Sequence, residues 1–248
     1  MKYIIPLVVC IFFFAQCKKT TDDVKPPASF DTLGVHWVVL EGTNISYYFQ
    51  DFAHQANYAQ QYVDEHEAAY VQLNARFKAK LPKKLRFFIW YDASLAAQIL
   101  GHQLGFTLPD QCIVHIRPTQ TIGHEMTHAL VYWAGGIPTI HETRFVNEGI
   151  AVASDLSNQN KLEMAKSAAS GQSFHSIIDL WDGPYEYASE EIFYPIAGAF
   201  MQYLDNQNMP DQFNALLKKQ TLADAEDIYG KGRMDSLIAN FDAQIGLK

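Results

Sequence analysis

The residues best suited to chemistry lie near the middle of the chain, in the run His124-Glu125-Met126-Thr127-His128. On an α-helix, residues four positions apart lie about 40° from each other around the axis, so the two imidazoles can reach one metal ion. Glu125 lies on the rim of the same face, where its carboxylate can contact a metal-bound water without binding the metal. The spacing therefore predicts a metal site with a general base beside it.

A third ligand is expected, because a catalytic zinc ion usually has three protein ligands and one open position. Glu148 follows His128 after an interval that is long enough for a turn over 135–138 and a second helix. A third histidine at the spacing of the extended motif is excluded, because Val131 and Ala134 occupy its key positions. Two histidines and one carboxylate are a common zinc-binding set, so the sequence predicts one Zn²⁺ per chain.

The surroundings of this triad resemble a known family, the gluzincin metallopeptidases, which include thermolysin and the aminopeptidase-N family. The interval between His128 and Glu148 is similar to that of thermolysin, and the run Asn147-Glu148-Gly149-Ile150-Ala151 is more similar to aminopeptidase N. The run from Tyr194 to Leu204 is similar to the helix of that family that begins with a transition-state tyrosine. The resemblance is specific around the triad and weaker over the later helix.

The resemblance implies a zincin-like fold and a role for each matched residue. The expected roles are zinc ligand for His124, His128 and Glu148, general base for Glu125, and hydrogen-bond donor to the oxyanion for Tyr194. Tyr185 and Tyr187 compete with the last of these residues for its role.

The chain departs from the family in two places. No Gly-Ala-Met-Glu-Asn motif, which in the aminopeptidases holds the free N-terminus of the substrate, precedes His124, so endopeptidase and exopeptidase activity both stay open. One turn after the third ligand, thermolysin-like enzymes have a carboxylate that orients a zinc histidine. This chain has Val152 there, and Asp155 is the candidate substitute.

These residues together predict zinc-dependent hydrolysis of peptide bonds in extracytoplasmic peptides or proteins. Zinc would activate a water and polarise the scissile carbonyl, while Glu125 would take the proton of the water and pass it to the leaving amine. The strand expected at Cys112–Ile116 resembles the edge strand along which such enzymes bind an extended peptide. The alternative is a non-catalytic, surface-tethered binding protein that keeps the metal, although such a protein has no need for Glu125.

The pattern along the chain predicts the elements that position these residues. Strands are expected over 35–40, 45–49, 85–91 and 112–116, with a long helix over 53–80, a helix after Asp92 and a loop over 101–110. From residue 119 onward the pattern is helical, with segments expected at 121–133, 146–157, 160–169, 190–206, 210–218, 221–229 and 232–245. The predicted fold class is α+β, with a small mixed N-terminal sheet followed by a mainly helical C-terminal lobe.

Other motifs favour structural roles. His66-Glu67-Ala68-Ala69-Tyr70 repeats the start of the metal motif without its second histidine, and we interpret it as a solvated face of the long helix. Phe87-Phe88-Ile89-Trp90 is typical of a strand that is buried on both faces. His115, His141 and His175 lie near enough in sequence to join the site, but surface or hydrogen-bonded roles are more typical of such histidines.

The N-terminal segment has the pattern of an exported protein. Residues 1–16 contain an apolar run that is too short to span a bilayer and is followed by polar residues, which predicts a signal peptide. The residues around Cys17 resemble a bacterial lipobox, which predicts lipidation of that cysteine. Phe14 and Gln16 depart from the usual lipobox, so secretion after ordinary cleavage is the alternative.

These patterns predict three segments: a signal peptide over 1–16, a lipidated tether over 17–29 and a single zincin-like metallopeptidase domain over 30–248. The expected location is the bacterial cell envelope, outer membrane or cell surface, with membrane contact only through the lipid anchor. Cys112 has no partner in the exported domain, which must then fold without disulfides.

The composition excludes several other classes of protein. Of the 248 residues, 48% are hydrophobic and 13% are aromatic, which suits a packed core and argues against a disordered chain. The 19 basic and 27 acidic residues give a net charge of −8 without a basic run, so nucleic acid is not expected as a partner. The expected partner is a peptide or protein substrate.

Overall fold

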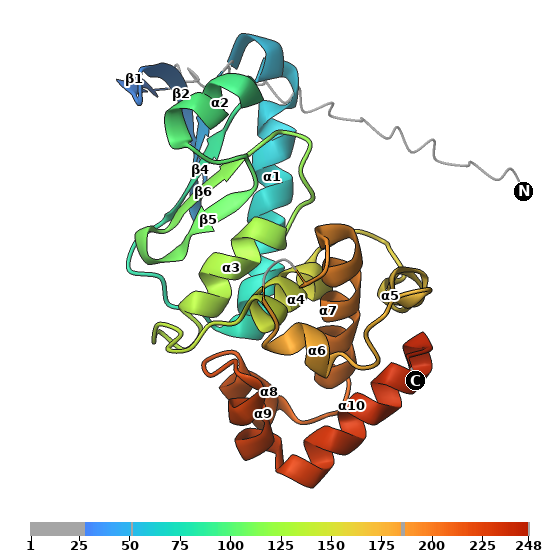
Figure 1. Cartoon of the computed structure of the whole chain (residues 1–248). Helices are drawn as coiled ribbons and strands as arrows, with labels where there is room; N and C mark the ends of the chain where they lie inside the picture. Colours follow the sequence, from blue (N-terminus) through green and yellow to red (C-terminus); the bar gives the residue numbers. More distant parts are fainter. Residues whose placement is uncertain (1–27, 51, 185–186, 248) are drawn as a thin grey trace, which may run out of the picture.

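The computed structural model describes residues 28–50, 52–184 and 187–247 (Figure 1). The predicted signal peptide over 1–16 and the lipidation site Cys17 lie outside these residues and stay predictions. Ala28 and Ser29, which the sequence places at the end of the tether, belong instead to the first strand, so the predicted tether extends too far. Among the residues described, no helix combines the length and apolar character needed to span a bilayer.

One mixed sheet forms the N-terminal part of the protein, with the strand order β1-β2-β3-β4-β6-β5. Its strands are β1 (Ala28–Thr32), β2 (Val35–Glu41), β3 (Ile45–Phe49), β4 (Leu85–Ile89), β5 (Phe106–Leu108) and β6 (Ile113–Ile116). β4 pairs in parallel with β3 and β6, and the remaining pairs are antiparallel. The predicted mixed sheet and α+β class are confirmed.

The edge of the sheet that contacts the helical lobe differs from the prediction. β5 lies within 101–110, where the sequence predicts a loop, and it pairs antiparallel with β6. β6, which the sequence predicts as the edge strand, therefore lies inside the sheet between β4 and β5. A strand of 3 residues between Gly105 and Pro109 is too short to show an alternating pattern, so the sequence does not reveal it.

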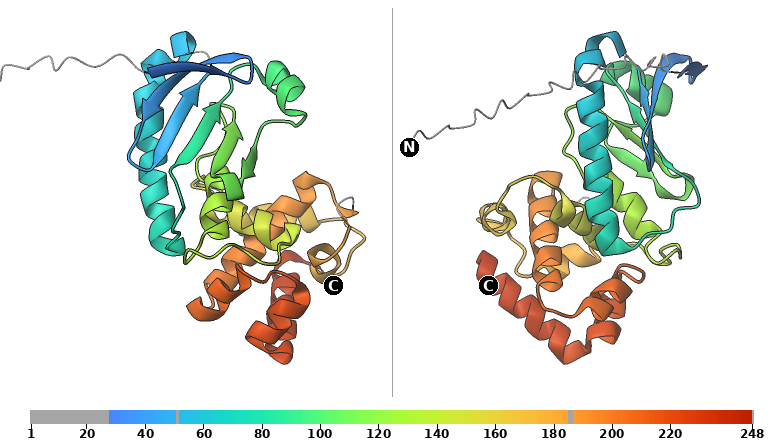
Figure 2. Two further views of the ribbon diagram at one scale, coloured as in Figure 1. Left: turned by 90° about the vertical axis from the view of Figure 1, so that its left-hand side faces the viewer. Right: turned by 180° about the vertical axis from the view of Figure 1, so that it is seen from behind.

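Helices cover both faces of the sheet. The long helix α1 (Phe52–Phe77) runs along one face (Figure 2), and α2 (Ala93–Leu100) packs on the other. Successive side chains of β4 point to opposite faces of the sheet. Phe87 and Ile89 join the core beneath α1, while Phe88 and Trp90 join a second cluster with α2. The prediction that this strand is buried on both faces is confirmed.

His66 and Glu67, on α1, do not lie on a solvated face of the helix, so the interpretation of this motif from the sequence is wrong. His66 is 2% exposed, and its ring stacks on Tyr62 with the centroids 3.9 Å apart. Burial lowers the pKa of His66 to about 4, so the neutral ring acts as a core residue. Glu67 accepts hydrogen bonds from the backbone N–H groups of Asn44 and Ile45 and holds the turn between β2 and β3.

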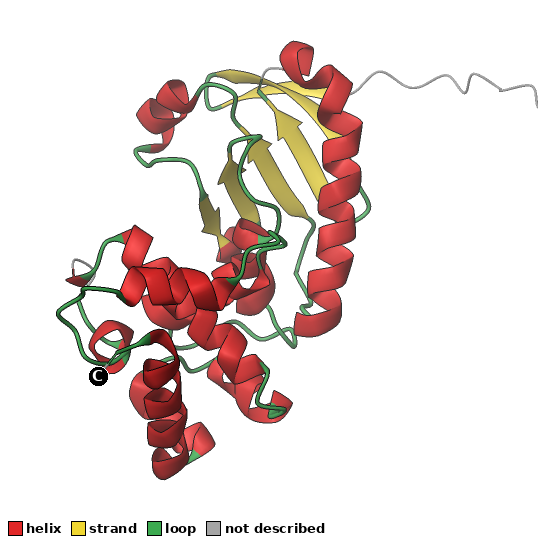
Figure 3. Cartoon of the chain, turned by 90° about the vertical axis from the view of Figure 1, so that its right-hand side faces the viewer, coloured by secondary structure: helices red, strands yellow, loops and turns green. Residues whose placement is uncertain are grey.

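The remaining helices form a second lobe beside the sheet (Figure 3). They are α3 (His124–Tyr132), α4 (Arg144–Ser154), α5 (Lys161–Ala169), α6 (Ile178–Trp181), α7 (Glu190–Asp205), α8 (Pro210–Leu216), α9 (Leu222–Tyr229) and α10 (Lys231–Ile245). Seven of these eight match predicted segments to within three residues at each end, and the four-residue α6 was not predicted. One continuous hydrophobic core joins the lobes, with members from Val114 on β6 to Phe241 on α10.

α4 and α7 pack against each other at two glycines. A Cβ atom at Gly149 would lie 2.8 Å from the backbone oxygen of Ala197, and one at Gly198 would lie 2.3 Å from Cγ1 of Val152. Both distances are shorter than atoms in a packed interior tolerate. Each helix therefore needs glycine where the other helix passes, and we call this contact the α4/α7 crossing.

We expect Gly198→Ala to lower the free energy of unfolding by about 1–3 kcal/mol, because the added methyl group overpacks the α4/α7 crossing. Urea denaturation measures this change. The double variant Val152→Ala/Gly198→Ala should lose less than the sum of the two single losses, because it removes the clashing methyl group. Additive losses, or wild-type stability in Gly198→Ala, would contradict this account of the crossing.

Candidate metal centre

α3 presents the metal motif on its first turn and a half. The helix begins at His124, later than the sequence predicts, directly after Gly123, whose φ of +107° suits only glycine. Met126 and Leu130 are buried against the core, so the helix is fixed with its other side toward β5 and α4. His124 and His128 both lie on that side and line the same cavity.

The C-terminal end of α3 is capped by Lys218, which lies between α8 and α9. Its ammonium group donates to the backbone oxygens of Val131, Tyr132 and Ile137 at 3.0, 2.9 and 2.6 Å. A cation is favourable at this end of a helix, where the carbonyl groups have no partners within the helix. Burial lowers the pKa of Lys218 to about 8. The lysine thus ties the metal-motif helix to the C-terminal helices.

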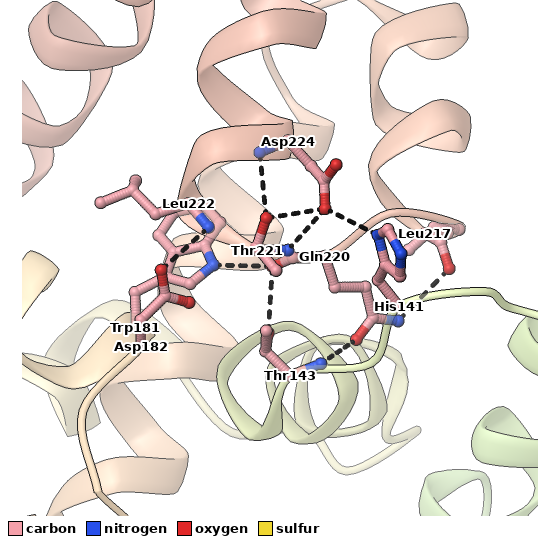
Figure 4. Close-up of polar contacts among 9 residues, drawn as sticks. All are labelled: His141, Thr143, Trp181, Asp182, Leu217, Gln220, Thr221, Leu222 and Asp224. Carbon is pink, nitrogen blue, oxygen red and sulfur yellow. Dashed lines mark hydrogen bonds and ion pairs between the residues drawn. The ribbon is translucent and has the colours of Figure 1, made fainter.

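A buried polar network holds the start of α4, the helix that carries Glu148 (Figure 4). Thr143 caps the helix, and its Oγ1 accepts a hydrogen bond from the N–H of Val146. Gln220 is fully buried, and its Oε1 accepts from the N–H of Thr143 at 2.9 Å. The backbone oxygen of Gln220 accepts from the Thr143 hydroxyl and from the indole N–H of Trp181. These bonds fix where α4 begins.

His124, His128 and Glu148 converge in space, as the sequence predicts. The Nε2 atoms of His124 and His128 lie 3.3 and 3.6 Å from Oε2 of Glu148, and the three ligand atoms all lie within 4.8 Å of one another. Ligands bound at about 2.0–2.2 Å in a tetrahedral zinc site lie about 3.3–3.6 Å apart. The triad could therefore hold a metal ion.

In the triad, the glutamate stabilises the protonated form of His124, and the histidines stabilise the ionised form of Glu148. Burial alone would lower the pKa of His124, but the hydrogen bond that it donates to Glu148 and the negative charge of Glu125 raise this pKa overall. Burial alone would raise the pKa of Glu148, but the two histidines lower it overall. A proton on His124 and a metal ion compete for the same nitrogen, so metal binding at this site must depend on pH.

The residue that orients His128 is Asn147, which the sequence does not single out. Its Oδ1 lies 3.2 Å from Nδ1 of His128, so Nδ1–H donates to the amide oxygen and Nε2 stays available to a metal. Its position next to Glu148 could have indicated this role, because a helix that brings Glu148 to the two histidines also brings the neighbouring residue close to them.

Neither Val152, at the position where the family has a carboxylate, nor the candidate substitute Asp155 is hydrogen-bonded to a histidine of the triad in the contacts described. Val152 packs at the α4/α7 crossing against Gly198, which explains why an apolar residue stands there. Oδ1 of Asp155 accepts a hydrogen bond from the N–H of Ser157, and the charge of this carboxylate contributes to the raised pKa of His124. Asp155 therefore acts on the triad through its charge.

A cavity of about 550 Å³ opens over the triad. β5 and the loop before it line one part of the cavity, and α3, α4, α7 and the segments that directly precede α3 and α4 line most of the rest. Glu125, which is 7% exposed, lines the cavity next to the triad. The structure therefore brings the expected general base and the expected ligands to one space.

Tyr194, on α7, lines the same cavity, and its ring centroid lies 6.3 Å from that of His124. Its hydroxyl group lies 3.5 Å from Oε1 of Glu190. Of its competitors, Tyr187 is 48% exposed and does not line the cavity, and Tyr185 lies outside the described residues. Between the two tyrosines that are described, the structure brings only Tyr194 to the site.

The other histidines considered for the site have structural or surface positions, as expected. His115 is buried in the sheet, where its Nδ1 accepts from the indole N–H of Trp90, and burial lowers its pKa to about 4. His141 lies 3.3 Å from the carboxylate of Asp224, and His175 is exposed. None of these three histidines lines the cavity.

Comparison of the chain with protein-family models, with curated proteins and with solved structures found no match.

We expect the protein to bind about one zinc ion per chain and His128→Ala to lose it, because a histidine and a carboxylate alone hold zinc weakly. Atomic emission spectroscopy after dialysis measures the metal content, and His175→Ala, at an exposed histidine, is the matched control. Because the pKa of His124 is raised, its proton persists to higher pH, so the affinity for zinc should fall as the pH is lowered. Equal zinc content in His128→Ala and the wild type would show that the triad is not the site.

Proposed function

We propose that the protein is a zinc metallopeptidase of the gluzincin type, which hydrolyses peptide bonds in extracytoplasmic peptides or proteins. The observation that carries this proposal is the convergence of His124, His128 and Glu148 at a cavity that Glu125 also lines. Among the described residues, three ligands come together. Three protein ligands leave a coordination position open, as catalytic zinc sites do, whereas structural sites usually have four.

The residues around the triad would share the work of hydrolysis. A bound zinc ion would activate a water and polarise the scissile carbonyl. Glu125 would accept a proton from the attacking water and donate it to the leaving amine, a role that fits a buried carboxylate at the wall of the cavity. Tyr194 would donate a hydrogen bond to the oxygen on which negative charge develops in the transition state.

β5 offers the surface along which a peptide would bind. Within the described chain β5 pairs with β6 alone, so its other edge carries backbone groups that an extended peptide can pair with. Gly105, Phe106 and Thr107 line the cavity, which places this edge beside the triad. β5 therefore replaces Cys112–Ile116 as the proposed substrate strand.

The proposed setting is the cell envelope, to which a lipid on Cys17 would attach the domain. The N-terminal sequence pattern supports this setting. Fractionation of cells that produce Cys17→Ser tests it, because loss of the lipid should move the protein from the membrane to the soluble fraction.

We expect Glu125→Gln to keep its zinc and to lower the rate of peptide cleavage by about 10²–10⁴-fold, because an amide cannot accept the proton. Cleavage of a mixed peptide library, followed by mass spectrometry, measures the rate, and a zinc chelator should abolish the activity of the wild type. Activity retained by Glu125→Gln would contradict the mechanism. A wild type that binds zinc and cleaves nothing would favour the non-catalytic binding protein instead.

For Tyr194→Phe we expect kcat to fall about 10²-fold with little change in KM, because the lost hydrogen bond acts only in the transition state. Tyr187→Phe, which removes the same hydroxyl group from a residue outside the cavity, is the matched control. Steady-state kinetics on one cleaved peptide measures both. Equal rates in the two variants would remove Tyr194 from the mechanism.

A further inference from the structure

Thr107, on β5, contacts the proposed general base in two ways. Its Oγ1 lies 2.9 Å from Oε2 of Glu125 and 2.8 Å from the backbone oxygen of the same residue. Thr107 is half-buried at the cavity, and Glu125 is buried beside it. The proposed mechanism of hydrolysis does not involve this threonine.

The two contacts leave one oxygen of the Glu125 carboxylate for the cavity. A threonine hydroxyl has one hydrogen to donate, and Oε2 and the backbone oxygen of Glu125 both lie within its reach. Thr107 therefore holds Oε2, and Oε1 is the oxygen of the carboxylate that this hydroxyl group does not contact.

The loop before β5 keeps this threonine close to α3. A Cβ atom at Gly105 would lie 2.3 Å from Nε2 of Gln120 and 3.6 Å from Oε1 of Glu125, and the φ of Gly105 is +98°. The backbone at Gly105 therefore passes beside the carboxylate where a side chain would collide with Gln120. This close approach brings Thr107 within hydrogen-bond distance of the helix.

We propose that Thr107 is a positioning residue, which holds the carboxylate of Glu125 so that Oε1 faces the scissile bond. The proposal rests on the proposed peptidase function. Thr107 belongs to β5, the strand that would pair with the peptide. The same strand would therefore position both the carboxylate of Glu125 and the backbone of the bound peptide. A hydroxyl group at this position fixes the geometry of proton transfer without contacting the substrate's reacting atoms.

Two substitutions test this role. Thr107→Val keeps the shape of the side chain and removes the hydroxyl group, while Thr107→Ser keeps the hydroxyl group. In Thr107→Val we expect kcat to fall at least about 10-fold, with KM and zinc content close to those of the wild type. Thr107→Ser should stay within about threefold of the wild type, and that rescue separates positioning from a general effect on packing.

A second measurement does not depend on turnover. A simple hydroxamate binds zinc through two oxygens and carries an acidic proton that a nearby carboxylate can accept. Calorimetry on the zinc-loaded protein should show about 10-fold weaker hydroxamate binding for Thr107→Val than for the wild type or Thr107→Ser.

The outcomes distinguish the two proposals. If the wild type cleaves no peptide but the hydroxamate affinities follow the expected order, the peptidase function fails and the positioning of Glu125 by Thr107 stands. If Thr107→Val matches the wild type in kcat and in hydroxamate affinity, or if Thr107→Ser falls as far as Thr107→Val, the positioning role is overturned and the peptidase function is unaffected.

Discussion

The α4/α7 crossing is the contact on which the geometry of the site depends. At Gly149 a backbone oxygen occupies the space of a side chain, and at Gly198 a valine does, so neither helix can slide along the other without overlap. Glu148 directly precedes the first glycine, and Tyr194 lies one turn before the second. The packing of these two helices therefore also sets the distance between Glu148 and Tyr194.

The orientation of α3 and α4 depends on a different kind of interaction, supplied by the segment between α8 and α9. Lys218 binds the end of α3, and Gln220 binds Thr143 at the start of α4. Polar groups that are buried must be hydrogen-bonded, so each of these contacts tolerates few arrangements. No described residue after α7 lines the cavity, yet these two side chains fix the helices that do. The C-terminal helices thus serve the site through its scaffold.

The sequence best predicts features that depend on the geometry of one helix. The spacing of His124 and His128 is enough to place both on one face of a helix, and Glu148 joins them if the next helix packs against the first. His66 and Glu67 show the limit, because the same local pattern becomes core once α1 lies on the sheet and Glu67 meets a turn that is distant in sequence. β5 is not predicted, because three residues are too few to show the alternation of apolar and polar side chains that marks a strand. Its place in the sheet comes from pairing with β6, which depends on the tertiary structure.

The charge of the cavity links the proposed cofactor to the stability of the fold. Four carboxylates line it, on Glu125, Glu142, Glu148 and Glu190, and no lysine or arginine is among the described residues that do. Partial burial raises the pKa of Glu142, and the charges of His128 and Lys218 offset this effect only in part. A divalent cation held by the triad would balance two of the four negative charges where water screens them poorly. Because such a cation binds the folded chain and not the dispersed ligands of an unfolded one, its binding must also stabilise the packing of α3 against α4.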